Sequence, residues 1–197
     1  MRKVVVNEFL SLDAVAQAPG GEEEDTSGGF KHGGWHMRYM DDNRAQEWVL
    51  GPINEAGSFL LGRRTYEIFA AYWPNAPEEE QVVAEPLNTK PKYVASRTLS
   101  DPLEWQNSTV LQGEVPEAVR ALKQEDGGDV HVIGSTELVQ TLIEHDLVDE
   151  FRLMIDPVVV GGGKRIFRDD GELRTLRLVE SEATGTGVIL AIYAPEA

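Results

Sequence analysis

The 197-residue sequence contains no cysteine, which excludes disulfide bonds, thiol catalysis and zinc sites built on cysteine. Histidines are few, and although His32 and His36 are four residues apart, no third ligand follows at a telling spacing, so we expect no metal site. No apolar run approaches the length of a membrane span. Any chemistry of this protein must therefore rest on side chains other than cysteine.

Basic residues are also scarce, with 18 lysines and arginines against 34 aspartates and glutamates and a net charge of −16. This acidity argues against broad nucleic-acid binding and against adhesion to anionic membranes, although a local arginine cluster can still hold an anionic small molecule. Residues 1–6 lack the long apolar segment and the cleavage site of a signal peptide, so we expect a cytoplasmic protein. A hydrophobic content of 41% suits one compact domain over residues 1–197.

Apolar runs alternate with helical patterns in most of the chain. We expect strands at residues 3–12, 58–61, 92–95, 109–111, 130–133, 150–155, 174–182 and 188–194. We expect helices at residues 41–56, 63–71 and 116–123 and in the second half of the unit 129–146, and a loop with at most a short helical turn over residues 73–86. The last two strands read as a β-hairpin. This order predicts an α/β fold with a mixed, mostly parallel sheet covered by helices on both faces.

Three predicted strands end in segments suited to phosphate binding: Gly62-Arg63-Arg64-Thr65, Ser96-Arg97-Thr98 and Gly134-Ser135-Thr136. Ligands of open α/β sheets bind at the carboxyl ends of the strands, so we expect these segments to lie together. Helix N-termini attract phosphate, and arginine matches its geometry. For the turn at residue 134 taken alone, an ordinary connection with a serine or threonine helix cap is the alternative.

Asp13 stands at the end of the first strand and at the head of a long, glycine-rich loop. It is a candidate for proton transfer or substrate binding, and a loop-capping role is an equal alternative. The loop, residues 13–40, is long enough to cover a ligand. Trp35, His36 and Tyr66 are candidates to line a substrate pocket, although a core position is the alternative for the aromatic residues.

Six segments carry a resemblance that spans nearly the whole chain. They are residues 11–13, 61–67, 96–99, 132–135, 147–150 and 157–167. Their order resembles the dihydrofolate reductase family, and especially its branch related to the C-terminal reductase domain of bacterial riboflavin biosynthesis. The resemblance implies a three-layer αβα fold with a C-terminal antiparallel hairpin, NADPH as cofactor, hydride transfer to a small heterocycle such as a pyrimidine or a pterin, and a homodimer.

The resemblance also assigns roles to individual residues. Those expected to contact NADPH are Gly62, Arg63, Arg64, Thr65, Ser96, Arg97, Thr98, Gly134, Ser135 and Thr136. The arginines would favour the 2′-phosphate, and hence NADPH over NADH. The sequence departs from the family at Ala14, where the branch has glycine, and in lacking the carboxylate motif of the first long helix. A dinucleotide-binding module without turnover, or a sugar-phosphate binder, therefore remains an alternative.

Overall fold

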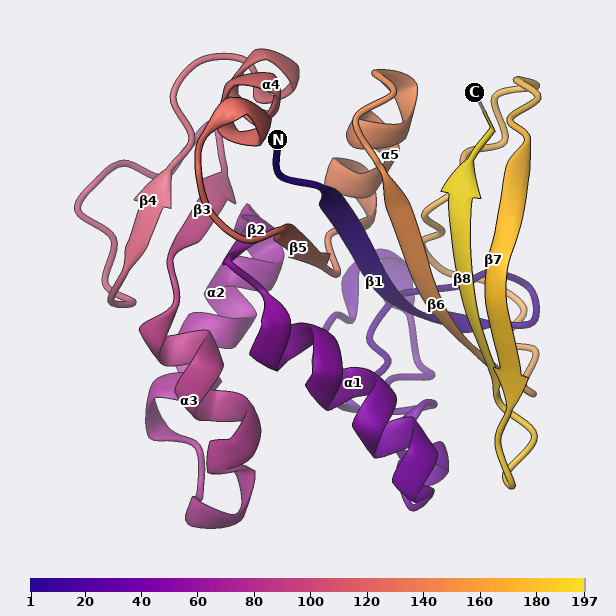
Figure 1. Ribbon diagram of the computed structural model, residues 1–197. Helices are drawn as coiled ribbons and strands as arrows, with labels where there is room; N and C mark the ends of the chain where they lie inside the picture. Colours follow the sequence, from indigo (N-terminus) through magenta and orange to yellow (C-terminus); the bar gives the residue numbers. More distant parts are fainter. Residues whose placement is uncertain (197) are drawn as a thin grey trace.

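The computed structural model describes residues 1–196, which are built around one eight-stranded sheet of order β4-β3-β2-β5-β1-β6-β8-β7 (Figure 1). The strands are β1 (Val4–Ser11), β2 (Ser58–Gly62), β3 (Lys92–Ala95), β4 (Ser108–Val110), β5 (Val130–Ile133), β6 (Glu150–Asp156), β7 (Leu176–Ala183) and β8 (Ile189–Pro195). Strands β1 to β6 pair in parallel, whereas β8 runs antiparallel to both β6 and β7. The expected mixed sheet and C-terminal hairpin are confirmed.

Helices cover both faces of the sheet. They are α1 (Asn43–Glu55), α2 (Arg63–Tyr72), α3 (Gln81–Thr89), α4 (Val115–Gln124) and α5 (Thr136–Glu144). The apolar stripes of α4 and α5 pack on the face that carries Val4, Val6 and Leu10 of β1. Helices α1, α2 and α3 contribute to the clusters on the other face. This gives the expected three layers, and among residues 1–196 no helix is both long and apolar enough to cross a membrane.

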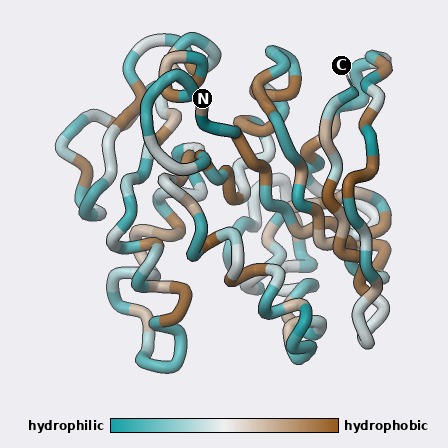
Figure 2. Tube along the Cα trace, in the orientation of Figure 1, coloured by the Kyte–Doolittle hydropathy of each residue, from teal (hydrophilic) through white to brown (hydrophobic). Residues whose placement is uncertain are grey.

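Figure 2 shows where the core lies, because hydrophobic stretches follow the central strands while hydrophilic ones follow the outer loops. Successive side chains of β1 point to opposite faces of the sheet. Val6 and Leu10 face α5, and Phe9 faces α1. Glu8 and Asn7 interrupt this apolar pattern, one on each face, and both are near the cleft described below.

The expectation of a loop over residues 73–86 is wrong at its end, because α3 begins at Gln81. Pro86 lies inside this helix and has no N–H to donate, which weakens the sequence signal for a helix. Ala84 and Leu87 are fully buried there, and Leu87 joins the core cluster under α2. Tertiary burial thus stabilises a helix that local propensity disfavours.

The long loop, residues 13–40, has only short 3₁₀ turns at Ser27–Gly29 and Met37–Tyr39. It is fixed to the connection between β6 and β7. Val15 forms a bridge with Arg165, and the Ala16 N–H donates to the Lys164 carbonyl at 2.9 Å. The loop is therefore bound along the rim of the sheet.

Candidate functional site

A cleft of about 1620 Å³ lies at the carboxyl ends of β2, β3 and β5 and continues beneath α1. The residues expected to contact a dinucleotide all line it. They are Gly62, Arg63, Arg64, Thr65, Ser96, Arg97, Thr98, Gly134, Ser135 and Thr136. The parallel order β3-β2-β5 brings the three turns together, as anticipated from the strand ends.

Ser135 joins the turn after β5 to the turn after β2. Its hydroxyl accepts a hydrogen bond from the Gly62 N–H at 2.8 Å and donates one to Thr65 Oγ1 at 2.6 Å. Ser135 has a left-handed φ of 69°, and its side chain caps no helix within the described residues, so the capping alternative is wrong for it. Neither α2 nor α5 has a side-chain cap in this part of the chain. Their first N–H groups therefore stay available to an anion.

The three arginines at this edge differ in their partners. Arg63 pairs with Glu67 of its own helix at 2.9 Å. Arg64 donates to both carboxylate oxygens of Asp25 at 3.0 and 3.2 Å. Arg97 has no ion-pair partner among residues 1–196, and it is exposed at the mouth of the cleft. Arg97 is thus the guanidinium that can take a phosphate without breaking an existing pair.

Asp25 connects the long loop to this edge. Lys164 Nζ lies 2.6 Å from Asp25 Oδ2, so the Asp25 carboxylate bridges Lys164 and Arg64. Burial opposes ionisation of Asp25, but the hydrogen bonds from Lys164 and Ser27 outweigh it and hold the Asp25 pKa below its usual range. The carboxylate therefore stays charged and ties the loop to α2.

Of the three residues expected to line a substrate pocket, only His36 lines the cleft. Trp35 is buried, and its indole N–H donates to the Gln17 carbonyl at 2.9 Å. Tyr66 is also buried, and its hydroxyl accepts from the Trp105 N–H at 3.1 Å. Both belong to the core. Tertiary packing decides whether such a side chain points inward or into the cleft, and the sequence alone does not show this packing.

His36 forms a buried pair with Asp156 at the end of β6. His36 Nδ1 lies 2.8 Å from Asp156 Oδ2, and the imidazole stacks on Phe9 at a centroid distance of 3.9 Å. Burial raises the Asp156 pKa above its usual value, against the opposing hydrogen bond from His36. His36 is only 2% exposed, and its Nε2 has no partner in the described residues. No motif marks Asp156 in the sequence, so this partner was not anticipated.

Asp13 does not line the cleft. Its carboxylate accepts hydrogen bonds from the Ser11 hydroxyl at 2.7 Å and from the N–H groups of Val160 and Gly161 at 3.0 and 2.9 Å. The bond from Ser11, followed by those from the backbone, lowers the Asp13 pKa to about 2. An anion held in this way fixes the loop that follows β6, which favours the loop-capping alternative over proton transfer.

Polar residues that the sequence did not single out form the floor of the cleft beneath α1. Asn7 Nδ2 donates to the Val5 and Val132 carbonyls at 3.1 and 3.3 Å and lies 3.1 Å from His131 Nδ1. Arg152 of β6 is paired in register with Asn7 of β1. In the sequence, each of these residues stands out only as a polar residue inside a strand. This signal is weak as long as the strand order is unknown.

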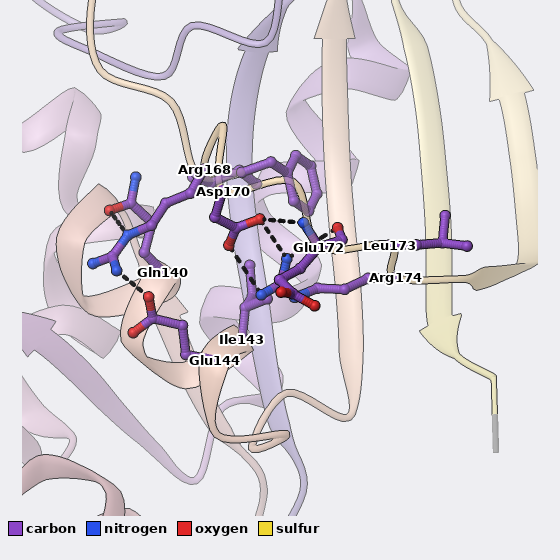
Figure 3. A pocket seen from close by; sticks show the side chains of 10 residues that line it. Gln140, Ile143, Glu144, Arg168, Asp170, Glu172, Leu173 and Arg174 are labelled. Carbon is purple, nitrogen blue, oxygen red and sulfur yellow. Dashed lines mark hydrogen bonds and ion pairs between the residues drawn. The ribbon is translucent and has the colours of Figure 1, made fainter.

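A smaller cavity of about 280 Å³ lies between α5 and residues 166–174 (Figure 3). Arg168 reaches Gln140 and Glu144 of α5. Arg174 pairs with Asp170 at 3.0 Å. Since these charged groups satisfy one another, the larger cleft is the better candidate for a ligand site.

The chain is similar to known proteins over nearly its whole length. A model of the RibD C-terminal domain family matches residues 2–190. The chain is 33% identical over 195 residues to the uncharacterized protein YyaP of Bacillus subtilis, covering 98% of this chain and 94% of YyaP. It is 29% identical over 131 residues to YwjB of the same organism, covering 66% of this chain and 70% of YwjB.

Two solved structures share the fold at low sequence identity. A putative riboflavin biosynthesis protein from Shewanella sp. PV-4 matches with a TM-score of 0.71 and 15% identity over 99% of both chains. A pyrimidine reductase-like protein from Corynebacterium diphtheriae matches with a TM-score of 0.64 and 13% identity, covering 100% of this chain and 92% of the other. At these identities the likeness establishes the architecture.

Proposed function

The chain belongs to the RibD C-terminal domain family, and from this premise we propose that it is an NADPH-dependent reductase that acts on a small heterocyclic compound. The family relation supports a reductase. The observation that carries the cofactor assignment is the meeting, in one cleft, of two helix N-termini without side-chain caps and of Arg97, which has no ion-pair partner among residues 1–196. Bound NADPH would supply a hydride to a C=N or C=O group of the substrate.

The residues at the strand ends fit a dinucleotide. Gly62 is required where the two turns approach, because a Cβ there would lie 2.7 Å from Ser135 Oγ. Gly134 has a left-handed φ of 61°, and a Cβ there would meet Thr65 Oγ1 at 3.3 Å. These turns present the first amides of α2 and α5, which would hold the pyrophosphate. Arg97, at the end of β3, would hold the 2′-phosphate.

Reduction of a C=N bond also needs a proton for the nitrogen. We assign this task to His36, because its Nε2 is buried, has no partner among the described residues and belongs to a side chain that lines the cleft. Asp156 would hold the imidazole in place through Nδ1, while the long loop excludes water. Asp13 would anchor the neighbouring loop without taking part in the proton transfer.

The cofactor assignment is tested by titrating the protein with NADPH and NADH, using tryptophan fluorescence or calorimetry. We expect NADPH to bind more tightly, and Arg97→Ala to weaken NADPH by at least about tenfold, roughly 1.4 kcal/mol, with little effect on NADH. Arg177→Ala, on the distant strand β7, is the matched control. Equal weakening of both dinucleotides by Arg97→Ala would remove the 2′-phosphate role.

Turnover is tested by following NADPH oxidation with a panel of pyrimidines, pterins, quinones and carbonyl compounds. Oxidation of bound NADPH by one class identifies the acceptor. Binding without oxidation by any of them would support the alternative of a nucleotide-binding module. We also propose a homodimer, for which light scattering in solution is the direct measurement.

A further inference from the structure

Buried polar atoms without hydrogen-bond partners gather in the part of the cleft beneath α1. Among residues 1–196, six buried side-chain atoms lack a partner. Three of them belong to cleft-lining residues on the α1 face of the sheet or above it: Asn7 Oδ1, His36 Nε2 and Arg152 Nε. Native proteins leave few such atoms unsatisfied, so a cluster of them indicates a bound group that satisfies them.

The orientation of the Asn7 amide follows from its surroundings. Its nitrogen donates to two backbone carbonyls, of Val5 and Val132, which an amide oxygen could not do. Burial lowers the pKa of His131 to about 4, so its ring is neutral, and its Nδ1 competes with these carbonyls for the two amide hydrogens. Asn7 Oδ1 is therefore the amide atom left without a partner among the described residues, on a residue that lines the cleft, and it needs a hydrogen-bond donor.

Arg152 supplies the complementary group. Its guanidinium stacks 4.4 Å from the centroid of the Trp48 ring, which fixes the plane of the fork. Its contact with Glu150 is long, at 3.8 Å, and Nε has no partner in the described residues. Arginine has no acceptor, so Nε needs an acceptor from the ligand.

The donor and the acceptor are neighbours on one face of the sheet. Asn7 and Arg152 are directly opposite in the β1–β6 register, and adjacent strands lie about 4.8 Å apart. We propose that this recess binds an uncharged planar ring through an amide edge, whose carbonyl accepts from Arg152 and whose adjacent N–H donates to Asn7. A carboxylate fits less well, because one of its two acceptor oxygens would face Asn7 Oδ1.

This assignment rests on the proposed function in one respect, which is that the bound ring is the reductase substrate. Apolar side chains of Trp48, Met154 and Ile133 line the same space and provide flat contact. Phe9, under the His36 ring, lies two residues beyond Asn7 on the same face, about 7 Å along β1. A ring anchored on Asn7 and Arg152 therefore extends toward His36.

The test uses three probes on the full-length protein, with ligand-observed NMR and with and without NADPH. They are 2-pyridone, which has the amide edge, 2-methoxypyridine, which lacks the N–H, and benzoate, which is an anion. We expect 2-pyridone to bind at least fivefold more tightly than either of the others. Asn7→Leu should abolish this preference, and Arg152→Met should weaken 2-pyridone to the level of 2-methoxypyridine. Ser108→Ala, which removes an unpartnered hydroxyl of β4 away from the cleft, should change nothing.

Tighter binding of benzoate would overturn the amide assignment in favour of a carboxylate site. Equal or absent binding of 2-pyridone and 2-methoxypyridine would overturn it as well. The wild-type probe series gives this answer even where Asn7→Leu fails to fold. NADPH titration is a separate measurement on different residues, so a failure of the recess and a failure of the cofactor site can be told apart.

Discussion

Ser135 Oγ lies 2.8 Å from the Gly62 nitrogen, and a Cβ added to Gly62 would lie 2.7 Å from the same oxygen. The turns after β2 and β5 are thus in direct contact, with no room for a side chain between them. This contact fixes how the N-termini of α2 and α5 lie relative to one another.

Gly62→Ala is therefore expected to separate the two turns and to weaken NADPH at least tenfold in a calorimetric titration. The backbone of Gly62 has φ of −76°, which alanine adopts freely, so the effect arises from the contact and not from strain. Ser135→Gly in the same chain removes the opposing atoms and should restore part of the affinity. A double variant as weak as Gly62→Ala alone would show that the contact is not the cause.

Arg63→Ala is expected to weaken NADPH more than NADH, because a guanidinium at the start of α2 suits the 2′-phosphate. Its effect should be smaller than that of Arg97→Ala, since Arg63 must first leave Glu67. Glu67→Gln provides the matched comparison, and it should strengthen NADPH binding slightly by freeing Arg63. The measurement is the ratio of the two dissociation constants, and an unchanged ratio in Arg63→Ala would leave the 2′-phosphate to Arg97 without a contribution from Arg63.

Asp25→Asn is expected to free Lys164 from the long loop and to weaken its hold on Arg64, which keeps a hydrogen bond to Ser27 Oγ at 2.7 Å. Both cations then become more available to an anion, so we expect faster and tighter NADPH binding in stopped-flow fluorescence, most clearly at low salt. The unfolding free energy should fall by up to about 1 kcal/mol at pH 7. Asp41→Asn, at an exposed position, is the control.

The sign of the pH dependence follows from the lowered Asp25 pKa. The stabilisation is present above the unfolded-state pKa of about 4 and is lost as the pH falls toward the folded-state value. The stability gap between wild type and Asp25→Asn should therefore close in acid. A gap that is as large at pH 2 as at pH 7 would mean that the charge of Asp25 does not hold the loop.

The convergence of Gly62, Ser96 and Gly134 was predictable from the sequence, because each follows a strand and parallel strands end at one edge of a sheet. The family resemblance could also be recognised from the sequence, because its motifs are local turns. The contacts between these turns could not be predicted. The bridge from Ser135 to Gly62 joins residues 73 positions apart, and only the adjacency of β2 and β5 brings it about.

The substrate side of the site was harder to predict, because its residues gain meaning only from strand register. Asn7 and Arg152 meet through the pairing of β1 with β6, and His36 meets Asp156 across 120 positions. Tyr66 shows the opposite error. Its aromatic side chain suggested a substrate-pocket residue, yet the helix turns it into the core against Trp105.

Glu8 carries a prediction that concerns stability. Burial, with a smaller contribution from the charge of Glu24, raises the Glu8 pKa from 4.5 to about 8. Between these two values the folded protein keeps the proton that the unfolded chain has released. The unfolded state then binds fewer protons, so the unfolding free energy decreases as the pH rises through this window, by about 1.4 kcal/mol per unit at most.

Glu8→Gln mimics the protonated form at every pH and should remove this dependence. We expect the variant to match the wild type near pH 4 and to exceed it increasingly up to about pH 8, as measured by urea denaturation across that range. Glu24→Gln, which removes only the neighbouring charge, should reduce the slope slightly. A stability difference that stays constant from pH 4 to pH 8 would mean that Glu8 is ionised in the folded protein. A buried carboxylate needs a cation or a hydrogen-bond donor beside it, and a ligand in the cleft would then have to supply that group.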